Sequence, residues 1–116
     1  MQREQKGKLY AKLVATVPDL ELKGDTVPYT SVNGHMCNYL SKDEVVALRL
    51  SAADREAFMT KYNASLMTAY GIVQKEYVAI PDALLNKVAA LGPWFQKGYD
   101  YVSSLKPRPT KKATKK

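Results

Sequence analysis

Cysteine and histidine are almost absent from this chain of 116 residues, which holds one of each, Cys37 and His35. A single cysteine excludes a disulfide within the chain. One cysteine and one histidine also fall short of the three or four ligands that a zinc site needs. No apolar run approaches the roughly 20 residues that span a bilayer, and no apolar signal region follows the charged segment 1–8. These absences predict a cytoplasmic protein without a membrane span or a cofactor.

Signatures of catalysis are also missing. The six glycines are dispersed and form no phosphate-binding loop. The carboxylates are scattered over solvated positions, such as the turn at Asp43 and Glu44 and the first helical turn at Asp54 and Glu56. His35 and Cys37 stand two residues apart on a predicted strand, so they are expected to share a face. Their separation of about 6–7 Å is long for a thiolate–imidazole pair. We interpret them as part of a half-buried strand face and predict that the chain is not an enzyme.

Positive charge is abundant, but it is concentrated in one segment. The net charge is +7, and residues 106–116 contain six basic side chains and no acid. Removing these six from the 18 basic residues leaves 12 against 11 acidic residues, a balance of +1. The six are Lys106, Arg108, Lys111, Lys112, Lys115 and Lys116. The basicity therefore belongs to this segment, here called the basic tail, and not to the predicted domain at residues 1–105.

The composition of the basic tail suggests both disorder and a binding role. It has two prolines and no large apolar residue, so burial of apolar surface could not offset the conformational entropy lost if the segment became ordered. Six cations can bind phosphates of nucleic acid in a sequence-independent, salt-sensitive way. The alternatives are a solubilising appendage and contact with an acidic protein or an anionic membrane. The lack of an apolar face disfavours membrane insertion.

The hydrophobic pattern predicts an α+β domain. Asn33-Gly34 lies between two short β-favouring runs, 27–32 and 35–40, which is typical of a hairpin with a type I′ turn. Ser51 is a candidate N-cap for the helix that follows, and Asn63 is a candidate stop. The other expected elements are a helix over 3–16, strands over 45–50 and 72–80 with a bulge or kink near Lys75, an irregular segment or weak strand over 64–71, and a final helical region interrupted at residues 92–93.

These elements give the order α-βββ-α-β(β)-α, which describes a two-layer fold with an antiparallel sheet and helices on one face. An aromatic cluster falls in the last predicted helix, toward the C-terminus. Its members are Trp94, Phe95, Tyr99 and Tyr101. We interpret the cluster as core or oligomer interface, with a base-stacking platform as the alternative.

Three phrases, residues 29–36, 47–51 and 75–81, resemble the TfoX N-terminal-domain-like proteins, and the related YjbR/MmcQ-like proteins share a similar strand-then-proline phrase. The resemblance covers roughly residues 5–105. It implies a two-layer domain similar to the secretion-chaperone-like fold and a tendency to dimerise, with no catalytic or cofactor residues. Full-length TfoX is associated with natural competence, but residues 26–29 replace the family's Met-Phe-Gly-Gly phrase and its second domain is not present. We expect the fold to transfer, and not the competence role.

The sequence therefore predicts a small non-enzymatic binding or adaptor domain, with accessory nucleic-acid contact through the basic tail. The alternative is a protein-interaction or oligomerisation module with no nucleic-acid role. A homodimer fits either prediction.

Overall fold

The structure, a computed structural model, describes residues 3–24, 27–69 and 71–105. Its helices are α1 (Arg3–Ala15), α2 (Ala52–Tyr62), α3 (Asp82–Leu85) and α4 (Val88–Ser104). Its strands are β1 (Tyr29–Val32), β2 (His35–Leu40), β3 (Val46–Arg49), β4 (Ser65–Ala69) and β5 (Ile72–Ile80).

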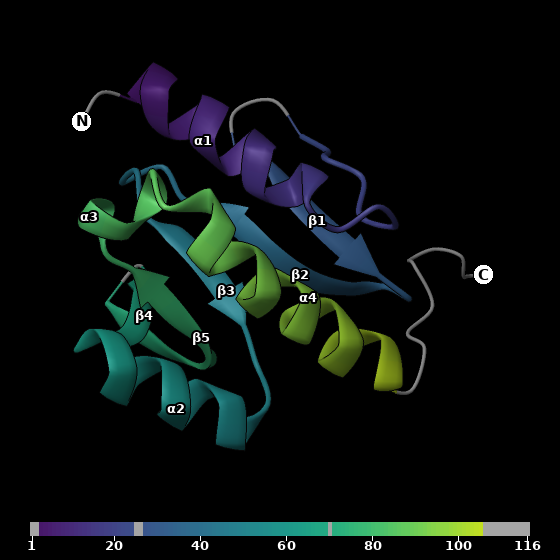
Figure 1. Cartoon of the computed structure of the whole chain (residues 1–116). Coiled ribbons are helices and arrows are strands. Elements are labelled where there is room, and N and C mark those ends of the chain that lie inside the picture. Colours follow the sequence, from purple (N-terminus) through teal and green to yellow (C-terminus); the bar gives the residue numbers. More distant parts are fainter. Residues whose placement is uncertain (1–2, 25–26, 70, 106–116) are drawn as a thin grey trace.

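The strands form a five-stranded antiparallel sheet in the order β1-β2-β3-β5-β4. The helices lie on one face of this sheet, with α1 and α4 side by side and α2 next to β5 (Figure 1). The predicted two-layer α+β class is confirmed, and the ambiguous segment 64–71 contains strand β4. None of the helices in the described residues is long and apolar enough to cross a membrane.

Several local predictions are confirmed by the backbone. Asn33 and Gly34 have φ values of 53° and 84°, so both adopt the left-handed region that a type I′ turn requires. The Ser51 hydroxyl accepts a hydrogen bond from the Asp54 backbone N–H at 3.3 Å and caps α2. Asn63, with φ 53°, ends the same helix in the left-handed conformation.

The predicted interruption of the last helix at residues 92–93 is wrong. Helix α4 continues through Pro93, and the break from α3 lies earlier, at Asn86 and Lys87. Pro93 removes one intrahelical hydrogen bond, the one to the Ala89 carbonyl. Ala89 and Pro93 are both exposed, so water can reach that carbonyl.

Two bulges decide which side chains point to which face. In β5 the partner of Leu66 is Val78 and that of Met67 is Gln74, which confirms the predicted irregularity near Lys75. In β2, Thr30 pairs with Asn38 and Ser31 with Met36, so Cys37 is an extra residue that simple alternation did not predict.

The core lies between the sheet and the helices, and most of the aromatic cluster contributes to it. Phe95 is fully buried, while Trp94, Tyr99 and Tyr101 are partly buried against the core. Trp94 meets Phe58 edge-on, with ring centres 5.2 Å apart. These rings are therefore occupied in packing the helical layer, as the core interpretation predicted.

Lys6 lies on the buried stripe of α1, a position where a charged side chain is uncommon. It is 6% exposed, and its Nζ donates to the Glu44 carbonyl at 2.7 Å and pairs with Asp82 at 3.1 Å. The aliphatic part of the side chain lies across the edge of the core, while the ammonium group binds the Glu44 carbonyl and the Asp82 carboxylate. One side chain thus joins α1, the β2–β3 turn and the start of α3.

Candidate binding site on the open face of the sheet

The face of the sheet opposite to the helices, here called the open face, has its own small apolar cluster. Tyr39, Ala47 and Met67 are its buried members. Tyr77 and Ala79 of β5 are partly buried against it, as is Val45 before β3. Small residues on the central strands keep this layer thin, so it is shaped mainly by the tyrosine rings.

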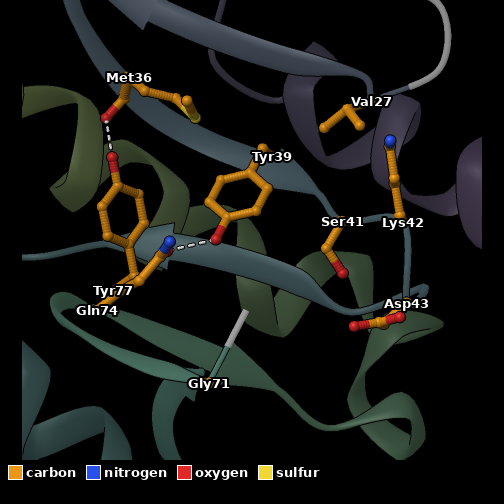
Figure 2. A pocket seen from close by; sticks show the side chains of 9 residues that line it. All are labelled: Val27, Met36, Tyr39, Ser41, Lys42, Asp43, Gly71, Gln74 and Tyr77. Carbon is orange, nitrogen blue, oxygen red and sulfur yellow. Dashed lines mark hydrogen bonds between the residues drawn. The ribbon is translucent and has the colours of Figure 1, made fainter. Parts of the chain in front are cut away.

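A hollow of about 620 Å³ lies on the open face. Its walls come from the segment before β1, the β2–β3 turn and the hairpin between β4 and β5, and two tyrosine rings lie side by side within it (Figure 2). The lining residues are Val27, Met36, Tyr39, Ser41, Lys42, Asp43, Gly71, Gln74 and Tyr77. The volume is within the range of ligand pockets, roughly 300–1,000 Å³.

Hydrogen bonds hold both tyrosine rings in place. The Tyr77 hydroxyl donates to the Met36 carbonyl at 2.7 Å, and the Tyr39 hydroxyl donates to Gln74 Oε1 (Figure 2). The rings meet edge to face, with centres 5.6 Å apart and an interplanar angle of 66°, an arrangement that aromatic pairs prefer. The hollow is therefore ordered without a ligand.

Arg49 supports Tyr77 from β3. Its Nε and Nη2 lie 2.7 and 2.6 Å from Glu76 Oε1, and its guanidinium carbon is 5.8 Å from the centre of the Tyr77 ring. Burial raises the pKa of Tyr77 to about 12, and the nearby Arg49 charge opposes that rise. Tyr77 is thus a neutral hydrogen-bond donor at physiological pH.

The opposite wall depends on the β2–β3 turn. The Ser41 hydroxyl accepts from the Val45 backbone N–H at 3.2 Å, and Glu44 has a positive φ of 66°. Lys6 binds the Glu44 carbonyl of this turn. A lysine from helix α1, in the helical layer, thus helps to fix the loop that carries Lys42 and Asp43.

The interpretation as a half-buried strand face is wrong for Cys37, which is fully buried. The bulge in β2 turns Cys37 into the helical core, whereas Met36 and Tyr39 line the open face. Burial raises the pKa of the Cys37 thiol to about 12, opposite to the lowered pKa of a nucleophilic thiolate. In the described part of the chain, no group of three or more His, Cys, Asp or Glu could hold a metal ion.

The predicted nucleic-acid contacts Lys106, Arg108, Lys111, Lys112, Lys115 and Lys116 lie outside the described residues. The open-face tyrosines were not predicted from the sequence, and stacking was considered only for the rings of α4. The alternation over residues 45–50 contains the missing information: Val46, Leu48 and Leu50 are large and apolar, while Ala47 and Arg49 are not. Such alternation is typical of a strand with one face in the core and one outside it.

A second hollow, of about 610 Å³, lies where the end of α1 meets the start of α4. Its lining has no aromatic ring and no charged side chain, and consists of Thr16, Val88, Ala89, Gly92, Pro93 and Gln96. It offers few groups that could orient a ligand, so the open-face hollow is the stronger candidate site.

The fold and the site define a two-layer α+β domain with one open sheet face and a preformed hollow on it. No family model, curated protein or solved structure matches the chain. The similarity to the TfoX N-terminal-domain-like proteins stays a prediction from the three sequence phrases.

Proposed function

We propose that this chain is a small non-enzymatic binding or adaptor domain of the TfoX N-terminal-domain-like type, which works in the cytoplasm. It holds its ligand on the open face and makes accessory contact with nucleic acid through the basic tail. One observation carries the proposal: the face opposite to the helices has a hollow of about 620 Å³ with two tyrosine rings already fixed by hydrogen bonds. A preordered site loses little conformational entropy when a ligand binds.

The charge distribution supports different roles for the two parts of the chain, with ligand binding by the domain and attraction of phosphates by the tail. Two basic side chains of the domain, Lys6 and Arg49, are engaged in ion pairs with Asp82 and Glu76. With a balance of only +1 over residues 1–105, the domain has little net attraction for a polyanion. The six cations of the basic tail would supply the long-range attraction.

The test compares the full chain with a full-length variant in which the six basic residues of the tail are changed to glutamine. Binding to a fluorescent oligonucleotide is followed by anisotropy across a salt series. We expect the logarithm of the affinity to fall with the logarithm of the salt concentration, with a slope of up to about −4 for six phosphates on a single strand. The glutamine variant should lose most of the affinity and most of the slope.

Absence of binding by the unchanged chain at low salt would contradict the nucleic-acid part of the proposal. Equal binding by the two chains would instead contradict the role of the tail.

A further inference from the structure

The residues that line the open-face hollow indicate which class of ligand it binds. We propose that the hollow binds an unpaired base of single-stranded nucleic acid, which stacks on Tyr77. This inference rests on the proposed function and names the ligand class of the same site.

The aromatic part of the hollow suits a flat ring. Tyr77 is only half-buried, and the Met36 side chain, 42% exposed, lies at the same end of the hollow. Tyr39 supports Tyr77 edge-on. Bases of any sequence stack on exposed aromatic rings because every base has a π face. An antiparallel sheet with helices behind it and aromatic rings on its open face is a known kind of surface for single strands.

The polar part of the hollow suits the edge of a base. Gln74 Oε1 accepts from Tyr39, and the amide NH₂ group of the same side chain is a hydrogen-bond donor. The Asp43 carboxylate lies on the opposite wall as an acceptor (Figure 2). Base edges combine donors and acceptors, so a site with both kinds of group can hold one.

The charge of the hollow favours a base over a phosphate. Its lining contains one lysine, Lys42, and one acid, Asp43, so the two charges offset each other. A phosphate would gain little there, whereas an uncharged base would lose little solvation. The phosphates next to the bound base would then need cations from elsewhere in the chain.

The basic tail can supply those cations. It follows Leu105, and α4 ends at the same end of the sheet as the turn between β1 and β2 (Figure 1). Met36, at the start of β2, is near that turn.

The shape of the site also predicts selectivity. Bases within a duplex are paired and stacked on each other, so they cannot enter a hollow on a sheet. The basic tail makes no such distinction because phosphates are present in both forms. Single strands should therefore bind more tightly than duplexes of the same length, and only the open face should account for the difference.

The experiment measures anisotropy of a labelled single strand of about twelve nucleotides and of the matching duplex. It compares the full chain with Tyr77→Leu and with the control Tyr99→Leu, a half-buried tyrosine on α4. We expect Tyr77→Leu to weaken single-strand binding by about 5- to 150-fold. Duplex binding should be unchanged, and the control should match the unchanged chain.

A second pair of variants covers the case in which Tyr77→Leu fails to fold. Met36→Glu adds a negative charge at the exposed edge of the hollow, and Thr60→Glu adds the same charge at an exposed position of α2. We expect the first to weaken single-strand binding more than the second. Circular dichroism checks that each variant is folded.

Equal affinity for single strands and duplexes, with each open-face variant equal to its control, would overturn the inference. If the glutamine variant of the tail still lost binding in that case, the proposed electrostatic contact would stand alone. Loss of self-association in light scattering, without a change in nucleic-acid binding, would also overturn the inference and assign the open face to a protein partner. No binding by any chain would refute both the inference and the proposed nucleic-acid contact.

Discussion

Two glycines in helices should respond in opposite directions to the same substitution. Gly98 of α4 packs against strand β3, and a Cβ atom built on it would lie 2.7 Å from the Arg49 carbonyl oxygen and 3.0 Å from Leu48 Cδ1. At Gly7 of α1, apart from the neighbouring residues and backbone of its own helix, no heavy atom of the described residues lies within 4 Å of the same position. We therefore predict that Gly98→Ala destabilises the fold and that Gly7→Ala stabilises it.

The magnitudes follow from two terms. Alanine in place of glycine inside a helix stabilises by about 0.5–1 kcal/mol, because the unfolded chain has less freedom to lose. At Gly98 this gain is opposed by overpacking, which costs about 1–3 kcal/mol, and the neighbour is a backbone carbonyl that cannot rotate away. With an overpacking cost near the larger end of its range, Gly98→Ala should lower the free energy of unfolding by about 2 kcal/mol.

The assay is urea unfolding of both full-length variants, followed by circular dichroism. Since about 1 kcal/mol corresponds to 4–8 °C in a domain of this size, a thermal scan should separate the two variants clearly. Gly98→Ala with a stability equal to or above that of the unchanged chain would refute the close approach of α4 to β3. The Gly7→Ala variant controls for helix propensity, because it has the propensity gain without the clash.

Three further outcomes are expected at buried polar groups. Lys6→Met should lower the free energy of unfolding by about 1–3 kcal/mol, since it removes the partner of the Glu44 carbonyl and of Asp82; no loss in urea unfolding would contradict this. Tyr10→Phe removes the 2.6 Å hydrogen bond to buried Asn38 Oδ1 and should cost about 1 kcal/mol, whereas an unchanged urea midpoint would show that the bond adds nothing. The Cys37 thiol, with its pKa raised to about 12 by burial, should resist alkylation near about pH 8 in the folded state and react in denaturant. Its contribution to stability is complete below the ordinary pKa of 9.0 and is lost as the pH rises toward 12, so Cys37→Ala should flatten that part of the pH profile.

Local sequence patterns predicted much of the fold because their physical causes are local. Asn33-Gly34 fixes its turn through backbone conformations that few residues adopt, and Ser51 fixes a helix start through one side-chain hydrogen bond. The continuation of α4 through Pro93 could not be predicted in this way. It depends on the exposure of Ala89, which the tertiary structure decides.

The candidate site was less predictable because it depends on bulges and on contacts between distant residues. One extra residue at Cys37 puts Cys37 on the same face as Leu40, and Met36 on the same face as Tyr39, which strict alternation does not allow. The bond from the Tyr77 hydroxyl to the Met36 carbonyl joins residues 41 positions apart. Neither the bulge nor this hydrogen bond can be recognised from the local hydrophobic pattern. The small and polar residues that alternate with large apolar ones in β3 do indicate that an open face exists.

The most direct test of the open face as the ligand site is a methyl NMR titration of the unchanged chain, labelled with ¹³C at methionine, with a single-stranded oligonucleotide. Met36 lines the hollow and Met67 lies in the open-face cluster, while Met59 packs against the core beneath the helices. The account predicts large shifts for Met36, smaller shifts for Met67 and none for Met59. Shifts at Met59 alone, or binding with no shift at Met36, would contradict it.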